Sequence, residues 1–248
     1  MSRTVLVTGG TGGIGSAVVY AMAEAGYDVV IGYVQAEEKA RDLQQKITGE
    51  FGVRCMAVRG NVADEEDVDA MITAIEAELG GVDILINNAG IDLPDLFSRK
   101  TAEQFRRVLD VNVVGAYNCA VRVWPHMKEQ GYGRIINISS TNGMNTYYPM
   151  CFDYDASKAA LNALTHDLAV QFAPFVHVNA VAPGFIGTPK ELEGYDPEIL
   201  KQETEKILVQ RYGKPEEVAS LVRFLVSDEA DYINNTIIRI DGGQMGSC

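Results

Sequence analysis

Strand-like and helical segments alternate along almost the whole chain, and this alternation limits the possible folds more than any other feature. The strand-like runs are residues 4–7, 29–33, 55–59, 84–87, 134–139, 176–182 and 237–240. The helical segments are 16–25, 37–51, 64–79, 101–130, 154–172, 198–208 and 216–227. Such alternation predicts an α/β fold, a parallel sheet with helices on both faces. Because no linker, low-complexity segment or repeat interrupts it, we expect a single domain over residues 1–248.

A glycine-rich loop joins the first strand-like run to the first helix. It reads Thr8-Gly9-Gly10-Thr11-Gly12-Gly13-Ile14-Gly15. Backbone N–H groups at a helix N-terminus can bind a pyrophosphate, and glycine allows close approach or positive φ. The loop therefore predicts a dinucleotide site, although its glycines at 9, 13 and 15 depart from the commoner G-x-G-x-x-G spacing. The alternative is a glycine-rich turn without a chemical role.

Tyr154 and Lys158 are spaced i and i+4 in a run of helix formers without Pro or Gly. Residues so spaced lie on one helical face, with Cβ atoms about 5–6 Å apart. A neighbouring ammonium favours a phenolate and lowers its pKa, so Tyr154 could exchange a proton with a reacting oxygen near neutral pH. Taken alone, the pair could also be an ordinary surface contact.

Composition excludes several classes of function. The formal net charge of −13 argues against binding to nucleic acid or an anionic membrane. No apolar run approaches the about 18 residues of a membrane helix, and the N-terminus lacks a signal-peptide pattern. Widely scattered cysteines (Cys55, Cys119, Cys151 and Cys248) predict reduced thiols and a cytoplasmic location. The histidines are too dispersed for a zinc site, so we expect no metal.

With these motifs in order, the chain resembles the short-chain dehydrogenase/reductase family over essentially its whole length. The family pattern T-G-x-x-x-G-x-G is matched by Thr8 through Gly15, and N-N-A-G by Asn87-Asn88-Ala89-Gly90. The further matches are Asn112, Ser140, Tyr154 with Lys158, and Pro183-Gly184 with Thr188. The resemblance implies a Rossmann-type, doubly wound, mostly parallel seven-stranded sheet and an NAD(P)(H)-dependent oxidoreductase.

Four residues match the family's catalytic positions. By resemblance, Tyr154 is the general acid–base, and Lys158 favours its phenolate and holds the nicotinamide ribose. Ser140 would hydrogen-bond the reacting oxygen, with adjacent Ser139 as the rival assignment. Asn112 would hold a water in a proton relay. Hydride transfer belongs to the cofactor.

The resemblance also implies a set of cofactor-binding residues. They are Gly9, Thr11, Gly13, Ile14, Gly15, Tyr33, Gln35, Asn61, Val62, Asn88, Ala89, Gly90, Tyr154, Lys158, Pro183, Gly184, Ile186 and Thr188. The second strand ends in Tyr33-Val34-Gln35, without the carboxylate that binds a ribose 2′-OH, so we expect NADP(H) over NAD(H). No Arg stands there or in the glycine loop, and Gln35 and Lys39 are nearest to a 2′-phosphate. Asn87 and Asn88 could instead be turn formers, and Thr188 a loop cap.

The substrate is less constrained. Within the family, the general pattern, including Ile240-Asp241-Gly242-Gly243 near the C-terminus, resembles that of 3-oxoacyl-acyl-carrier-protein and acetoacetyl-CoA reductases, which favours a 3-oxoacyl thioester. However, helical segments around Tyr154 offer few of the basic groups that an acidic carrier protein would need. Candidate substrate contacts are Asp92, Tyr147, Tyr148 and Cys151. The aromatic ones could form a wall for a steroid, sugar or polyol ketone, or could pack between subunits.

Residues 189–212 are polar and irregularly patterned, and we expect a substrate lid there. By family resemblance the protein would be a homo-oligomer, a tetramer or dimer, with helices 101–130 and 154–172 at the interface. Two other classes stay open at this point. One is a dinucleotide-binding regulator without chemistry, and the other is a lyase or epimerase on the same fold.

Overall fold

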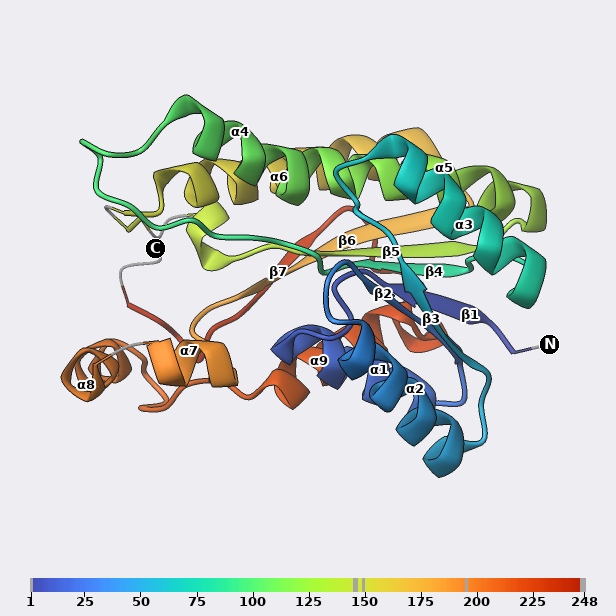
Figure 1. Cartoon of the computed structure of the whole chain (residues 1–248), viewed down its shortest axis with the longest axis horizontal. Coiled ribbons are helices and arrows are strands. Elements are labelled where there is room, and N and C mark those ends of the chain that lie inside the picture. Colours follow the sequence, from blue (N-terminus) through green and yellow to red (C-terminus); the bar gives the residue numbers. More distant parts are fainter. Residues whose placement is uncertain (1, 145–146, 149, 195, 246–248) are drawn as a thin grey trace.

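The sheet is parallel throughout and runs in the order β3-β2-β1-β4-β5-β6-β7 (Figure 1). It belongs to a computed structural model that describes residues 2–144, 147–148, 150–194 and 196–245. The strands are β1 (Thr4–Val7), β2 (Asp28–Tyr33), β3 (Cys55–Arg59), β4 (Ile84–Asn87), β5 (Gly133–Ile138), β6 (Val176–Pro183) and β7 (Ile237–Ile240). The predicted doubly wound α/β fold is confirmed, and strand order reverses between β1 and β4.

Helices cover both faces of this sheet (Figure 1). One face carries α1 (Gly13–Glu24), α2 (Glu37–Phe51) and α9 (Pro215–Val226). The other carries α3 (Glu65–Leu79), α5 (Gly115–Gln130) and α6 (Phe152–Phe172), with α4 (Ala102–Leu109) packed against α6. The short helices α7 (Pro189–Gly194) and α8 (Pro197–Glu205) lie beyond the carboxyl ends of the strands.

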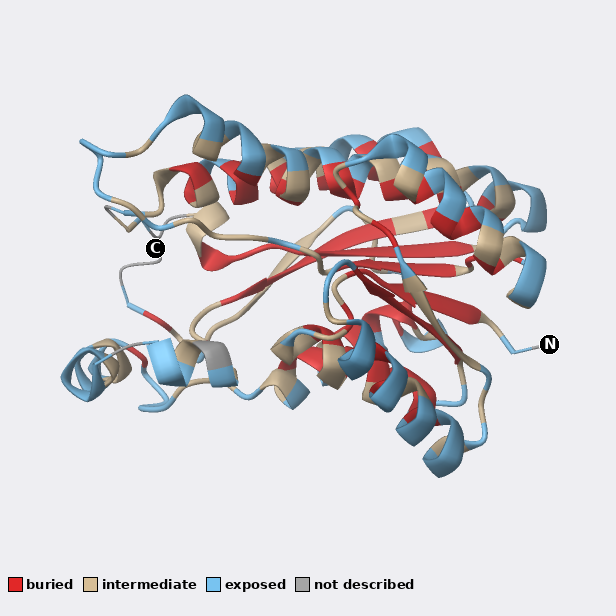
Figure 2. Cartoon of the chain, in the orientation of Figure 1, coloured by how far each residue is buried: buried red, intermediate tan, exposed pale blue. Residues whose placement is uncertain are grey.

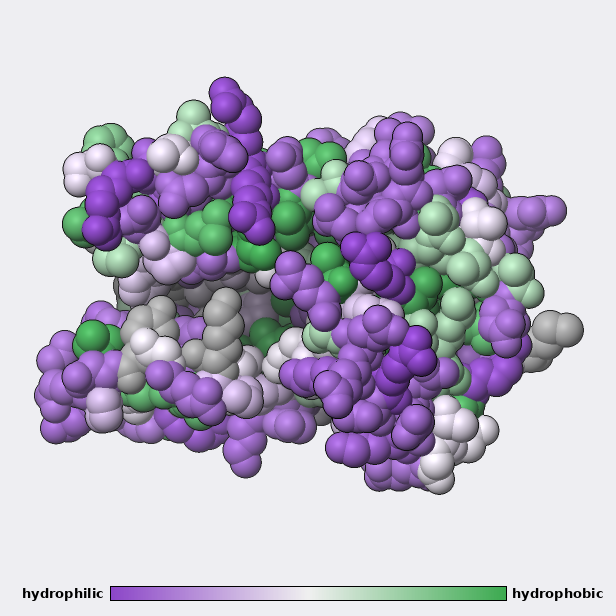
Figure 3. Space-filling model, in the orientation of Figure 1, coloured by the Kyte–Doolittle hydropathy of each residue, from purple (hydrophilic) through white to green (hydrophobic). Residues whose placement is uncertain are grey.

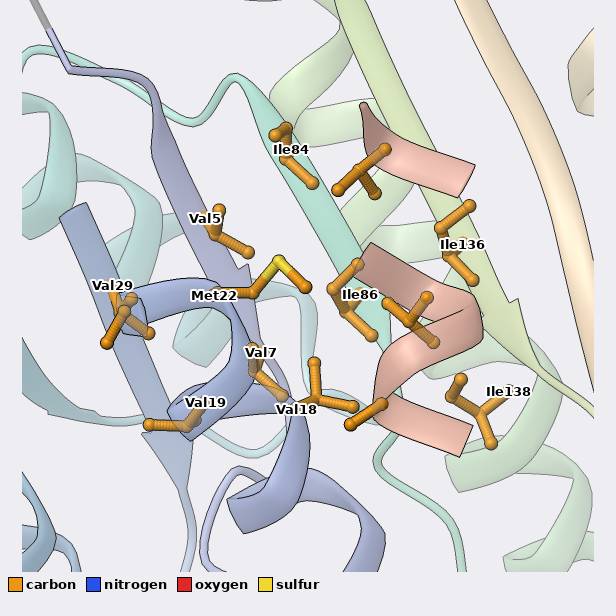
Figure 4. Close-up of a cluster of buried hydrophobic side chains, with 14 of the residues drawn as sticks. Val5, Val7, Val18, Val19, Met22, Val29, Ile84, Ile86, Ile136 and Ile138 are labelled. Carbon is orange, nitrogen blue, oxygen red and sulfur yellow. The ribbon is translucent and has the colours of Figure 1, made fainter. Parts of the chain in front are cut away.

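The central strands are buried on both faces, so their apolar side chains build two cores (Figure 2). Strand side chains such as Val5, Ile86 and Ile136 meet Val18 and Met22 of α1 in the first core (Figure 4). The intervening strand residues, such as Leu6, Leu85 and Ile135, pack against α3, α5 and α6 in the second. Two packed faces fix the strands, and hence fix where their carboxyl-end loops meet.

The predicted helix at 101–130 is interrupted. A π-helical turn, Asp110–Val114, separates α4 from α5 and contains the buried Asn112. Such π-turns are frequent at functional sites because they redirect a side chain from the helical repeat. Propensity does not distinguish this turn from an α-helix, so the sequence did not predict it.

The segment after Thr188 contains a short helix that was not predicted. Residues Pro189–Gly194 form α7, whose start is capped by the Thr188 hydroxyl, which accepts a hydrogen bond from the Glu191 amide at 3.3 Å. Proline fits a first helical turn because its missing N–H needs no partner there. The predicted helix at 198–208 ends as α8 at Glu205. The lid role of 189–212 stays a prediction.

Within the part of the chain that the structure describes, no helix combines the length and apolarity that crossing a membrane requires.

Candidate functional site

The glycine loop and the Asn-Asn-Ala-Gly segment hold each other in place. The Thr8 hydroxyl accepts hydrogen bonds from the Asn88 and Ala89 amides, each at 3.0 Å. The Asn88 side-chain amide donates to the Thr8 and Gly9 carbonyls at 2.9 and 3.1 Å. Asn88 therefore braces the loop through its side chain, while buried Asn87 bonds Asn137 at 2.9 Å inside the protein.

Glycines in this loop stand where a side chain would collide. Gly9 has a φ of +62°, and a Cβ on Gly15 would lie 2.7 Å from the Asn88 Nδ2. A Cβ on Gly13 would lie 2.7 Å from the Thr188 Cβ, so the loop after β6 touches the start of α1. Gly12, the N-cap residue of α1, offers no side chain to its first-turn N–H groups. The first-turn N–H groups of α1 are therefore suited to bind an anionic group such as a pyrophosphate.

Other predicted cofactor residues lie along the same edge of the sheet. Thr11 and Ile14 are half-buried in the loop, and Ile14 packs against the first core. Pro183 ends β6, the Gly184 amide donates to Ile240 at 3.1 Å, and Ile186 is buried. This arrangement brings the segment from Pro183 to Thr188 against the glycine loop.

The adenosine end of the predicted site is formed by β2 and β3. Tyr33 ends β2, is buried, and accepts a hydrogen bond from the Gly60 amide at 2.9 Å, whereas Gln35 is exposed. The Asn61 side chain accepts from the Ala63 amide at 3.2 Å and so forms its own turn. Val62 is buried, and its carbonyl accepts from Asn118 at 3.1 Å.

Tyr154 and Lys158 lie on one face of α6, as their spacing predicts. The Lys158 Nζ is 5.4 Å from the centroid of the Tyr154 ring and donates to the Ile138 carbonyl at 2.7 Å. Gly90 closes the other side, since a Cβ there would lie 3.6 Å from this Nζ. The ammonium is thus buried between the ends of β4 and β5 and the helix.

Ser140, and not Ser139, meets the Tyr154 phenol. The Ser140 hydroxyl interacts with the Tyr154 phenol and lowers its pKa, and it also donates to the Asn142 Oδ1 at 3.3 Å. The Ser139 hydroxyl instead donates to Asn162 at 2.6 Å inside the protein. Because successive residues of an extended chain point to opposite sides, only one of the two serines can reach the cleft.

Asn112 connects the loop after β4 to α6. Its Oδ1 accepts from the Ile91 amide at 2.8 Å, and its Nδ2 donates to the Ile91 carbonyl at 2.9 Å. The same Nδ2 donates to the Ser157 hydroxyl at 3.0 Å, which in turn donates to the Tyr154 carbonyl at 2.7 Å. The four predicted catalytic residues are therefore brought together.

The expected lowering of the Tyr154 pKa is wrong for this structure. Burial raises the pKa of Tyr154, and the hydrogen bond with Ser140 offsets only part of that rise. Burial also lowers the pKa of Lys158 to about 8. The ammonium attracts a phenolate, but burial removes solvent from both groups, and this loss of solvent has the larger effect on the Tyr154 pKa. The Tyr154 hydroxyl consequently keeps its proton at neutral pH.

The four predicted substrate contacts separate into two groups. The Cys151 thiol donates to the Asp92 carboxylate at 3.6 Å, and the negative charge of Asp92 raises the pKa of Tyr154. Tyr148 bonds Glu203 of α8 at 3.3 Å, and its ring meets Phe185 edge-on. Tyr147 is instead 74% exposed. Burial raises the pKa of Cys151 to about 12, so its thiol is a poor nucleophile.

The predicted aromatic wall stays a prediction. Residues Tyr147, Tyr148 and Phe152 line a pocket of about 500 Å³ beside Ala156 and Ala159 of α6, a pocket that Tyr154 does not line. Figure 3 shows the molecule hollowed between the α4–α6 layer and the α7–α8 segment.

Three features around the site were not predicted from the sequence. A buried ion pair joins Lys100 to Asp153, directly before Tyr154. Arg59, at the end of β3, pairs in register with Tyr33. Exposed Arg106 and Arg107 stand on α4, which packs against α6, and they were not counted among the basic groups expected near Tyr154. Of these features, the sequence offered a sign of the ion pair alone, because the charged Asp153 directly precedes Tyr154.

We expect Gly15→Ala to disrupt dinucleotide binding, because the new methyl group overlaps the Gly9 carbonyl and the Asn88 side chain. Overpacking of this kind costs about 1–3 kcal/mol, equivalent to about 5- to 150-fold in Kd. Calorimetric titration with NADPH measures it. Gly49→Ala on α2, where nothing lies within 4 Å of the added Cβ, is the control. Equal affinities in both variants would contradict a tightly fitted loop.

Comparisons with known proteins agree with this geometry. The family model described as enoyl-(acyl carrier protein) reductase matches residues 9–245. The chain is 37% identical to a 3-oxoacyl-(acyl-carrier-protein) reductase of Staphylococcus aureus over 98% of both chains. It is 40% identical to an acetoacetyl-CoA reductase of Rhizobium meliloti, over 98% of this chain and 99% of that one.

Among solved structures, a gluconate 5-dehydrogenase from Burkholderia cenocepacia, in complex with NADP and tartrate, superposes with a TM-score of 0.91. It is 31% identical, and the match covers 98% of this chain and 95% of that one. The chain therefore belongs to the short-chain dehydrogenase/reductase family and is an NAD(P)(H)-dependent oxidoreductase acting on a carbonyl or secondary alcohol.

Proposed function

We propose that this enzyme reduces a ketone with Tyr154 as proton donor and Ser140 as the group that orients the carbonyl oxygen. The bound dinucleotide supplies the hydride. The proximity of the Ser140 and Tyr154 hydroxyls carries this proposal, because one oxygen placed between them could accept a hydrogen bond from each. A ketone oxygen at that position would accept from Ser140 and receive the phenolic proton as negative charge develops on it.

The raised pKa of Tyr154 supports the reductive direction. A phenol that keeps its proton at neutral pH is ready to donate, whereas alcohol oxidation needs the phenolate. The rate of alcohol oxidation should therefore increase as pH rises toward the pKa of Tyr154, and the rate of ketone reduction should not. Lys158 has three N–H donors, of which the Ile138 carbonyl takes one, and the others suit a ribose hydroxyl.

Asn112 would act by holding the loop after β4 against α6. Its side-chain hydrogen bonds to Ile91 and Ser157 support this role. The proton relay through an Asn112-bound water, implied by family resemblance, stays a prediction.

Tyr154→Phe tests the mechanism. The ring and its packing remain, so we expect NADPH affinity within about twofold of the parent and a loss of at least about 100-fold in kcat, the lower range for general acid–base catalysis. Stopped-flow oxidation of NADPH measures kcat, and calorimetry measures binding. Tyr232→Phe, at a fully exposed tyrosine outside the site, is the control. Retained turnover in Tyr154→Phe would refute the assignment.

We further propose that the preferred cofactor is NADP(H). The end of β2 offers no carboxylate to repel a 2′-phosphate, since Tyr33 occupies the last position of that strand. Gln35 and Lys39 are exposed just beyond it. Arg59 adds a cation from the neighbouring strand: it is exposed and directly opposite Tyr33 in the β2–β3 register.

Arg59→Ala tests this cofactor preference. A charge-assisted hydrogen bond contributes about 1.5–3 kcal/mol, so we expect the ratio of kcat/KM for NADPH over NADH to fall by about 10- to 150-fold. Steady-state kinetics with both cofactors measures the ratio. Arg41→Ala is the matched control, because Arg41 is paired with Glu37 on α2. A parent enzyme that prefers NADH would overturn the proposal.

The substrate we propose is a 3-oxoacyl thioester. Two relatives at 37% and 40% identity are named as reductases of such compounds. Arg106 and Arg107 on α4 could meet an acidic carrier protein beside the cleft. Their proximity to α6 supports docking on that side.

A dehydrogenase of small polyhydroxy compounds is the second candidate. Asp92 favours it, because a carboxylate beside Tyr154 can accept a hydrogen bond from a substrate hydroxyl. The structural neighbour named as a gluconate 5-dehydrogenase has a similar fold at 31% identity. The negative charges of Asp92 and Glu191 limit this candidate to some substrates, because they would repel a ketone that carries its own carboxylate next to the carbonyl.

A substrate panel separates these candidates. NADPH oxidation should be fastest with acetoacetyl-CoA and other 3-oxoacyl thioesters, and slower with diketones, keto-sugars and steroid ketones. Arg106 and Arg107 give α4 a basic surface that would bind an acidic carrier protein. The double variant Arg106→Ala with Arg107→Ala should therefore raise KM for a carrier-protein thioester and leave KM for a small diketone unchanged. Turnover confined to keto-sugars would instead establish the second candidate.

We also propose a homo-oligomer. Val114, Tyr117 and Val121 are exposed at i, i+3 and i+7 along α5 and its preceding turn, and Val170 is exposed on α6. An apolar stripe of this kind is typical of a protein interface. The cytoplasmic location and the absence of nucleic-acid partners stay predictions.

A further inference from the structure

Lys100 and Asp153 form a fully enclosed ion pair next to the proposed proton donor. The Lys100 Nζ lies 2.7 Å from the Asp153 Oδ2, and the two side chains are 2% and 0% exposed. The same ammonium donates to the Leu93 carbonyl and lies 5.4 Å from the centre of the Phe152 ring. The pair therefore joins the loop between β4 and α4 to the first turn of α6.

This loop holds the Tyr154 backbone at two points. On the amide side, the Lys100 ammonium donates to the Leu93 carbonyl and to the Asp153 carboxylate. The Asp153 Oδ1 accepts a hydrogen bond from the Tyr154 N–H at 3.0 Å. On the carbonyl side, the Ile91 amide donates a hydrogen bond to the Asn112 side chain. Asn112 in turn donates to the Ser157 hydroxyl, which donates to the Tyr154 carbonyl.

The loop and the segment before α6 share one further hydrogen bond, from the Asp95 amide to the Met150 carbonyl at 3.2 Å. Both sides of the Tyr154 residue are thus tied to residues 91–100.

Stability alone is a poor explanation for such a pair. Removing two charges from water is costly, and an apolar pair of similar volume is often equally stable or more so. A buried ion pair does, however, define one geometry, because each charge must meet the other at hydrogen-bond distance. Asp153 immediately precedes Tyr154, so any shift of this pair is transmitted to the phenol.

We propose that Lys100 and Asp153 are positioning residues for Tyr154: the ion pair fixes the phenol against the loop that follows β4, and so against the bound ketone. The inference rests on the proposed role of Tyr154. A displacement of about 1 Å at a reacting group can reduce turnover about 100-fold, without any loss of cofactor affinity. Neither side chain touches the substrate in this role.

The test uses the double variant Lys100→Met with Asp153→Leu, in which neither charge is left without its partner. We expect the folded variant to bind NADPH with a Kd within about twofold of the parent. Its kcat should fall about 10- to 100-fold, with KM changed much less. Asp153→Asn, which keeps the size and the Oδ1 acceptor, should show an intermediate loss of kcat.

The matched control is Arg122→Met. Arg122 pairs with Asp69 and Glu76 between α5 and α3, away from the site. It should alter thermal stability and leave kcat unchanged. A purely structural role for Lys100 and Asp153 would give the same pattern as this control.

A double-mutant cycle completes the test. In the Tyr154→Phe background the Lys100 and Asp153 substitutions should cost less than about twofold in kcat, because the group they position is gone. A folded double variant with parental kcat would overturn the inference, while inactive Tyr154→Phe would leave the proposed function intact. If neither the double variant nor Asp153→Asn folds, the pair is a folding determinant and the inference is wrong.

Discussion

The hydrogen bonds around the Thr8 side chain and Asn88 are the constraint on which the site depends. Thr8 follows β1 and Asn88 follows β4, the two strands between which the sheet order reverses. Their mutual bonds leave no room for a side chain at Gly9 or Gly15. A ligand of an open α/β sheet binds at such a reversal, because loops there diverge to opposite faces. The glycine loop is thus specified by packing before any cofactor contact is considered.

Much of the fold followed from the sequence, for physical reasons that are local. Strand and helix periodicities are properties of short windows, so all seven strands and most helices were predicted within a few residues. The Tyr154–Lys158 contact follows from one helical turn. The choice of Ser140 over Ser139 came from its position in the family pattern. Side chains alternate along an extended chain, which explains why Ser139 points into the protein interior instead.

What the sequence could not give depends on contacts between distant segments. Lys100 and Asp153 meet only because α4 packs on α6, and Arg59 stands beside Tyr33 only through the β2–β3 register. The π-helical turn at Asn112 likewise reflects tertiary packing, since no local propensity favours it. The direction of the Tyr154 pKa shift failed for the same reason, because burial is a property of the whole fold.

Burial gives Tyr154 and Lys158 complementary shifts. Loss of solvent disfavours charge on either group, which raises the pKa of the phenol and lowers the pKa of the ammonium to about 8. Near neutral pH the phenol then carries its proton, and most of the Lys158 population is still charged. A site in that state has a proton to give and a cation to stabilise the phenolate left behind. Desolvation, which acts on both groups, therefore leaves little phenolate at neutral pH.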